Sequence, residues 1–213
     1  MIFKDKIQIF NKKSKLRQEL DNLIFNLPNS DIIAKELLEE LGNKKTQIVF
    51  DKDIKGNYYV YLNDTIYLCD KQSKKNNYER LCVIAHESIH SVQPKFLQNL
   101  NFIISNMELV SFIVFLILYF LKLNRLYIYL GYMVVALLSI IPRLILELWA
   151  INKAPKLSRK YLESKNIDTK DVKKVYNLYT FSSKLLIPIA IIVFFLNKLF
   201  RILIATVLLL VNL

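Results

Sequence analysis

The residues with the clearest chemical potential form an HExxH pattern, in which His86 and His90 stand four positions apart and Glu87 follows the first histidine. On a helix, residues four positions apart lie on one face, one turn apart, so both imidazoles can bind the same metal ion. A carboxylate beside the first ligand is placed to take a proton from a water molecule that the metal activates, which is the chemistry of zinc hydrolases. The pattern therefore predicts a Zn²⁺ site with Glu87 as general base.

The two histidines, which are the only ones in the chain, could instead be polar groups that cap a helix or lie at a membrane surface. The neighbouring residues favour the metal. Residues 83–85, Ile89 and Val92 are apolar, so the helix expected over residues 78–93 is predicted to be buried. A buried pair of imidazoles needs polar partners, and a metal ion supplies one.

The composition is that of a membrane protein, because 54% of the residues are hydrophobic. The net charge of +12, from 30 Lys and Arg against 18 Asp and Glu, would suggest nucleic acid as the partner of a soluble protein. Basic residues that flank apolar spans explain the charge better, since they orient membrane proteins and attract anionic lipid. The predicted partners are therefore the lipid bilayer and a peptide or protein substrate, with no nucleic acid.

Cys69 and Cys82 are the only cysteines, and their spacing is not that of a metal or redox motif. We expect both to be reduced, with Cys82 on the buried side of the motif helix. No cleavable signal peptide is visible after Met1, so insertion into a membrane is predicted to use internal spans.

The first part of the chain is predicted to have two regions. Residues 1–29 form a basic amphipathic segment, whose helix over residues 7–25 could lie on a lipid surface or cover the domain. Residues 30–101 form a small α+β region of zincin type. Its first helix is expected to be capped by Ser30 and Asp31 and ended by Gly42. The apolar face of this helix comprises Ile32, Ile33, Leu37, Leu38 and Leu41.

Three short runs with the composition of β-strands follow, over residues 46–50, 58–62 and 65–69. Asn63 and Asp64 are expected to form a two-residue turn between the last two runs. A strand edge beside the motif helix could accept an extended peptide as a further strand, although the sheet could also serve only for packing.

A transmembrane hairpin is predicted over residues 102–150. The first span, residues 102–121, has Glu108 as its only charge, and a tight turn at residues 122–125 leads to a second span that Pro142 and Arg143 weaken. A hairpin returns the chain to the side of the motif helix, so Glu147 is predicted to be the third protein ligand. Its alternative role is that of an interfacial anchor.

Residues 151–184 form a basic helical segment and residues 185–213 a C-terminal membrane segment. Residues 153–184 hold nine Lys and Arg against three acids, whereas the hairpin turn holds only Lys122 and Arg125. By the positive-inside rule, the basic segment and the metal site face the cytoplasm. The sequence leaves open whether the C-terminal segment, with Lys198 and Arg201 near its middle, crosses once, twice or re-enters.

These residues together resemble the YugP-type neutral zinc metallopeptidases of bacterial membranes. The likeness rests on HExxH followed three positions later by Gln93, and on Glu147, Ala150 and Ala154 in an ExxAxxxA pattern. It covers roughly residues 30 to 200. The resemblance implies a gluzincin-like peptidase of the bacterial plasma membrane, with His86, His90 and Glu147 on zinc and Glu87 as base.

The chain departs from that family at two points. The basic segment replaces the usual first transmembrane helix, and Ile89 stands where the HExGH motif of the family has glycine. HtpX-like and CAAX-type membrane proteases share the order of motifs but have Asp where this chain has Ile151. A non-catalytic membrane adaptor that keeps a zinc or polar site is a further alternative, as is a lipid-surface binding protein. The predicted fold is a mainly α membrane protein with a small α+β zincin-like region.

Overall fold

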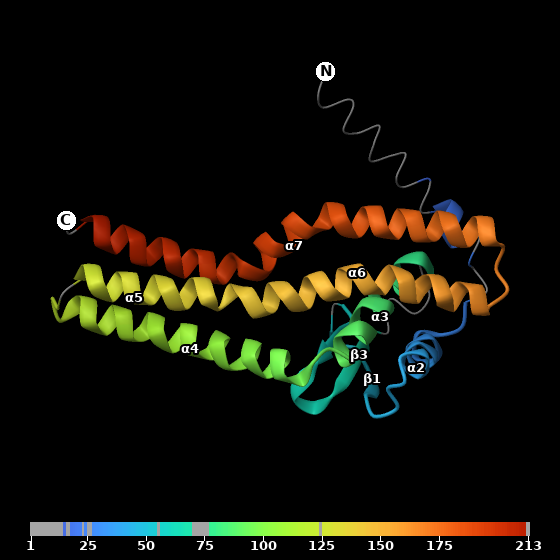
Figure 1. Ribbon diagram of the computed structural model, residues 1–213, viewed down its shortest axis with the longest axis horizontal. Helices are drawn as coiled ribbons and strands as arrows, with labels where there is room; N and C mark the ends of the chain where they lie inside the picture. Colours follow the sequence, from blue (N-terminus) through green and yellow to red (C-terminus); the bar gives the residue numbers. More distant parts are fainter. Residues whose placement is uncertain are drawn as a thin grey trace, which may run out of the picture. The chain divides into compact units, whose positions relative to one another are not determined.

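The computed structural model describes residues 15, 18–22, 24, 27–54, 56–69, 77–123 and 125–211, without the side chains of residues 185–194 and 211. The chain forms two compact units (Figure 1). The first unit comprises residues 1–92 and 150–184, and the second unit comprises residues 93–149 and 185–213. Most of the predicted N-terminal helix lies outside the described residues. Within its described part, Leu20 and Ile24 are buried in the core of the first unit, so this part covers the domain.

In the part that the structure describes, the first unit combines a small sheet with whole helices and with parts of two helices that continue into the second unit. Its strands are β1 (Gln47–Asp51), β2 (Tyr58–Val60) and β3 (Thr65–Cys69), and its helices are α2 (Ser30–Glu40), α3 (Asn77–Ser91), the second part of α6 (Ile140–Ser164) and the first part of α7 (Thr169–Val211). The strand order is β1-β3-β2, with β3 parallel to β1 and antiparallel to β2. Because β2 pairs on one side only, it is an edge strand.

The predicted two-residue turn between β2 and β3 is wrong. Pairing starts at Val60 and Thr65, so four residues connect the strands, and Tyr61–Asn63 form a 3₁₀ turn. Asp64 then takes a left-handed conformation with φ 48°. Its carboxylate accepts hydrogen bonds from the Thr46 and Tyr59 hydroxyls at 2.7 and 2.9 Å, which holds the wider turn in place.

Helix α2 ends as predicted but begins differently. Gly42, at φ +70°, receives the chain after the helix and donates its N–H to the Glu39 carbonyl. The predicted cap is wrong, because Ser30 is the first helical residue, and Asn29 before it makes no side-chain capping bond. The predicted apolar face is confirmed at Ile33, Leu37 and Leu38, which are buried, but Ile32 is exposed and Ala34 is buried in its place.

Helix α3 carries the motif through the core of the first unit. Its residues Leu81, Ile84, Ala85 and Ile89 are buried together with Ala150 and Ala154 of α6 and Val172, Val175 and Tyr179 of α7. Cys82 is buried and both cysteines are free thiols, as predicted. The prediction that Val92 is buried on this helix is wrong, because Val92 follows the end of α3 and its side chain is exposed.

The second unit contains α4 (Lys95–Phe120), α5 (Arg125–Leu138), the first part of α6 and the last part of α7. The turn between α4 and α5 is where the sequence predicts it. The second apolar stretch is interrupted at Ser139 and not at Pro142, because proline lacks the N–H that would bond the carbonyl four residues earlier. Two helical segments, Lys95–Phe120 and Arg125–Ser164, are long and apolar enough to cross a membrane.

A buried ion pair connects α4 to α7 within the second unit. Glu108 is fully buried, and its carboxylate accepts hydrogen bonds from the Arg201 guanidinium and from the Tyr132 hydroxyl of α5. Nearby, Lys198 donates to the backbone and the hydroxyl oxygens of Ser139 at 3.1 and 2.8 Å. The charges of the C-terminal segment therefore face polar partners, and the segment continues α7 as one helix to Val211.

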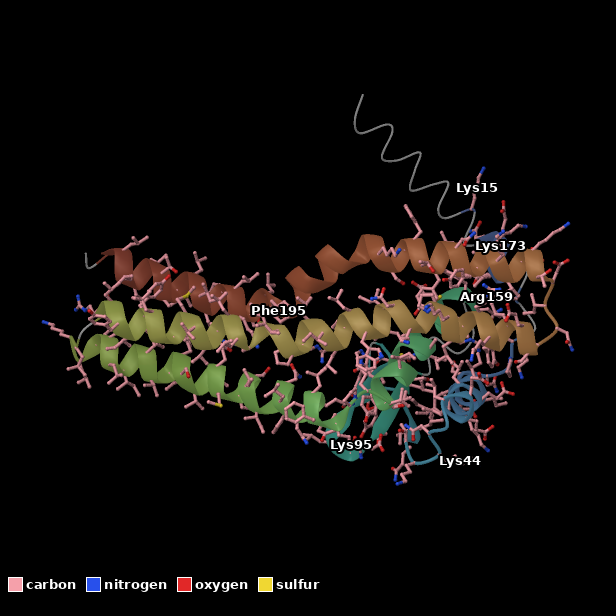
Figure 2. All side chains as sticks on the ribbon, viewed as in Figure 1. Lys15, Lys44, Lys95, Arg159, Lys173 and Phe195 are labelled. Atoms are coloured by element: carbon pink, nitrogen blue, oxygen red, sulfur yellow. The ribbon has the colours of Figure 1, made fainter. Side chains whose placement is uncertain are left out.

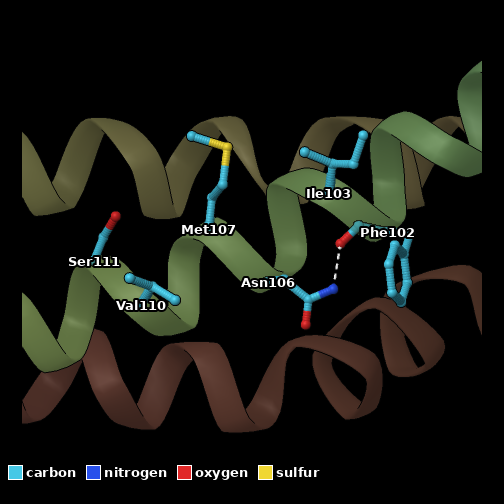
Figure 3. A pocket seen from close by; sticks show the side chains of 6 residues that line it. All are labelled: Phe102, Ile103, Asn106, Met107, Val110 and Ser111. Carbon is cyan, nitrogen blue, oxygen red and sulfur yellow. Dashed lines mark hydrogen bonds between the residues drawn. The ribbon is translucent and has the colours of Figure 1, made fainter.

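The side chains along α4 and α5 are mostly hydrocarbon (Figure 2). On one face of α4, Phe102, Ile103, Met107 and Val110 line a shallow apolar hollow (Figure 3). Asn106 lies in the same hollow and donates its amide to the Phe102 carbonyl at 2.8 Å. The helix thus supplies an acceptor for this amide from its own backbone.

Candidate metal centre

The two histidines of the motif converge on one point. Helix α3 places His86 and His90 one turn apart, and their Nε2 atoms are 3.1 Å from each other, with the rings at 81°. Two nitrogen ligands of a tetrahedral zinc ion, each at the usual bond length, would be about 3.3 Å apart. The imidazoles therefore already have the separation that a shared metal ion requires.

Glu147 is placed by its own helix and by the segment that follows α3. It stands one turn before Ala150 of the same helix, and Ala150 is fully buried in the core that contains Ile89. Within the second unit, the buried Gln93 amide donates to the Leu146 carbonyl at 2.6 Å. Glu147 belongs to the second unit and the two histidines to the first, and the three side chains form the group of His and carboxylate residues that could hold a metal ion.

The carboxylate of Glu147 is buried and has a cationic neighbour. Arg143, one turn earlier in α6, contacts Glu147 Oε1 at 2.6 Å. The Glu147 side chain is only 9% exposed, whereas that of Arg143 is 36% exposed. Because a carboxylate has two oxygens, it can keep this partner and still bind a metal ion. Arg143 would then fix the orientation of the ligand.

The predicted general base is held by the edge of the sheet. Glu87 Oε2 accepts the backbone N–H of Tyr59 in β2 at 2.8 Å. The Tyr59 hydroxyl donates a hydrogen bond to the Asp64 carboxylate. Burial is the main cause that raises the pKa of this phenol, and the hydrogen bond to Asp64 is the second. The edge strand therefore lies beside the motif helix, and it orients the Glu87 carboxylate through the backbone of Tyr59.

Further contacts fix α3 at both ends of the motif. Asn43 donates to the Ser91 hydroxyl at 3.0 Å, and Tyr179 of α7 donates to the Cys82 carbonyl at 2.6 Å. Burial raises the pKa of the Tyr179 phenol well above its usual value, so it acts only as a neutral donor. Sequence analysis did not identify Asn43, Tyr59 or Tyr179. Only Asn43, which directly follows the helix-ending Gly42, had a local signal.

The donor set fits a zinc ion. In the described part of the chain, the cluster offers two imidazoles and one carboxylate. Catalytic zinc sites use three protein ligands of this kind and leave a fourth position open, whereas structural sites use four. Neither cysteine belongs to the cluster, and the Cys69 thiol contacts the Ile54 carbonyl instead.

No protein-family model, curated protein or solved structure matches the chain.

Proposed function

We propose that this protein is a membrane zinc metallopeptidase of the YugP type, which hydrolyses peptide bonds in a peptide or protein substrate. The observation that carries the proposal is the convergence of the His86 and His90 Nε2 atoms on the motif helix, and the buried carboxylate of Glu147 would complete the ligand set. It is supported by Glu87, which stands next to the first ligand and is held by the Tyr59 N–H.

The proposed chemistry divides the work between the metal and the side chains. A zinc ion held by His86, His90 and Glu147 would lower the pKa of a water molecule and polarise the carbonyl of the scissile bond. Glu87 removes the proton from that water and passes it to the leaving amine. The Tyr59 N–H and the Gln93 amide keep the base and the Glu147 backbone in position.

The same proposal places the chain in the bacterial plasma membrane as a multi-pass protein. Its first candidate span is only 17% buried over its most apolar window, which is unusual for a core helix of a soluble protein. The basic residues of 153–184, set against Lys122 and Arg125 in the hairpin turn, favour a metal site that faces the cytoplasm.

The first test is the zinc content of the purified full-length protein. We expect about one zinc per chain in the wild type, since a single three-ligand site is proposed. The Glu147→Ala variant should lose the metal or bind it much more weakly. Glu163→Ala, which removes an exposed acid from the same helix, is the matched control and should keep it. A wild-type protein that takes up no zinc on reconstitution would refute the proposal.

The second test separates metal binding from hydrolysis. Glu87→Gln should keep zinc and lower the cleavage of a quenched fluorescent casein by about 10²- to 10⁴-fold, the usual cost of losing a general base. Glu79→Gln, an exposed change on the same helix, should cleave at the wild-type rate. Unchanged cleavage by Glu87→Gln would exclude this residue as the base.

The non-catalytic adaptor is favoured by one observation. The bond between Glu87 and the Tyr59 N–H satisfies an edge-strand amide, which is a structural task that requires no catalysis. An adaptor would bind zinc, cleave no peptide and retain its properties in Glu87→Gln. An HtpX- or CAAX-like protease would use the same ligands and differ in substrate only.

A further inference from the structure

A second polar site lies between α6 and α7, entirely within the first unit. This α6–α7 pocket has a volume of about 260 Å³. Ile151 and Pro155 form its apolar wall. Its polar lining consists of Asn152 and Lys156 from α6 and of Tyr176, Thr180 and Lys184 from α7. These residues recur at helical spacing, so each helix presents one continuous face to the pocket.

The pocket has an excess of positive charge. Lys156 and Lys184 line it, and none of its lining residues is acidic. Two other lysines of α6 have acidic partners, since Lys160 pairs with Glu40 and Lys165 with Glu36. Among the described residues, no carboxylate forms an ion pair with Lys156 or Lys184. The pocket therefore attracts an anion.

A buried hydroxyl in the same pocket points to a ligand with hydrogen-bond acceptors. The Thr180 Oγ1 atom is buried and has no hydrogen-bond partner among the described residues. Such a group is costly unless something binds to it. With the Asn152 amide and the Tyr176 hydroxyl, the pocket offers three neutral donors beside two ammonium groups. This donor set matches the several acceptor oxygens of a phosphate group.

We infer that the α6–α7 pocket binds a phosphate group, and that an anionic phospholipid headgroup supplies it. Both helices change from apolar to basic at this level, because Ile151 follows the apolar first part of α6 and Lys184 precedes the apolar residues 185–196 of α7. Lysines at such a boundary attract anionic lipid. Ile151 and Pro155 provide an apolar surface for the glycerol part. The inference is independent of the metal centre.

The test uses native mass spectrometry of the full-length protein in detergent, titrated with short-chain phosphatidylglycerol. We expect one tightly bound lipid on the wild type. The Lys156→Gln/Lys184→Gln variant should bind it at least about 10-fold more weakly, because each lysine near the surface contributes about 1 kcal/mol. The control, Lys153→Gln/Lys173→Gln, removes the same charge from exposed positions on the same helices and should bind like the wild type. Thr180→Val should weaken binding to a smaller extent.

Two further ligands distinguish the source of the phosphate. Inorganic phosphate should compete poorly with phosphatidylglycerol, and zwitterionic phosphatidylcholine should bind weakly. Competition by inorganic phosphate as strong as that of the lipid would support the phosphate site and overturn the lipid as its source. Equal losses in both double variants, or equal binding of phosphatidylcholine, would overturn the inference.

Discussion

Two buried carboxylates on the apolar helices have opposite surroundings. Glu108, in the middle of α4, is fully buried and contacts the Arg201 guanidinium with both oxygens and the Tyr132 hydroxyl with one. Glu147, near the start of α6, is also buried, but its cationic neighbour is the partly exposed Arg143 of the preceding turn. Glu147 is also the carboxylate of the group that could hold a metal ion, together with His86 and His90.

This difference separates a structural acid from a candidate ligand. A carboxylate inside an apolar region needs a charge of opposite sign, and Arg201 supplies it to Glu108 from 93 residues further along the chain. The cation beside Glu147, Arg143, is partly exposed, so it compensates the carboxylate less completely. A metal ion on Glu147 would compensate it further, which is why we propose metal binding for Glu147 and assign helix association to Glu108.

The largest expected effect breaks the ion pair of Glu108. Glu108→Ala should lower the free energy of unfolding by about 3–5 kcal/mol, because it leaves the Arg201 guanidinium without its buried partner. Replacing both residues, as Glu108→Leu with Arg201→Met, should restore most of the loss, since apolar residues can substitute for a buried pair. Denaturant unfolding in detergent measures both changes. Zinc content should stay at the wild-type level in the double variant.

The matched change at Glu147 sharpens the contrast. In zinc-free protein, Glu147→Ala should lower the free energy of unfolding by about 1 kcal/mol or less, because its ion pair with Arg143 is partly exposed. A loss as large as that of Glu108→Ala would show that both acids are structural, and would weaken the assignment of Glu147 to the metal.

A smaller effect concerns the hydrogen bond that fixes the backbone beside Glu147. Gln93→Leu removes the donor to the Leu146 carbonyl, and we expect it to weaken zinc binding by about 10-fold, as changes around metal ligands do. Competition with a chelator of known affinity measures the change. The control is Asn106→Leu, which removes an amide-to-carbonyl bond within α4, far along the chain from any ligand. Equal effects of the two variants would exclude a positioning role for Gln93.

The parts of the structure that the sequence predicts well depend on local rules. HExxH requires only helical spacing, and Gly42 ends α2 because its left-handed conformation costs glycine little. The turn between α4 and α5 was predictable from the loss of apolar residues, and β3 spans Thr65–Cys69 as the β-strand composition of its residues indicates. The prediction of Glu147 used one more rule, that a hairpin returns the chain to its starting side.

The missed features depend on contacts between distant residues or on the backbone. No local pattern connects Glu108 with Arg201, and the Tyr59 N–H that binds Glu87 is present in every residue except proline. The interruption at Ser139 appears before Pro142 because the missing N–H affects the preceding turn. The conformation of Asp64 likewise depends on Thr46, eighteen residues earlier.

The smallest expected effect uses a third acid, Glu36 of α2, whose carboxylate and Lys165 partner are both partly exposed. Burial alone would raise the pKa of Glu36, but hydrogen bonds from Lys165 and Tyr161 of α6, at 2.6 and 2.8 Å, outweigh it and lower the pKa below 4.5. The unfolded chain therefore binds the proton more tightly, so Glu36 stabilises the fold above pH 4.5, and this contribution is lost as the pH falls through its lowered pKa.

We expect Glu36→Gln to lower the free energy of unfolding by about 0.5 kcal/mol at neutral pH, since the pair is partly exposed, and by less at low pH. Thermal unfolding of the wild type and of Glu36→Gln, from neutral to low pH, measures this difference in stability. Glu39→Gln, which changes an exposed acid on the same helix, is the control. A difference that persists unchanged at low pH would mean that shape and not charge joins α2 to α6. Its disappearance would show that Glu36 acts through its charge, from a position that is partly exposed.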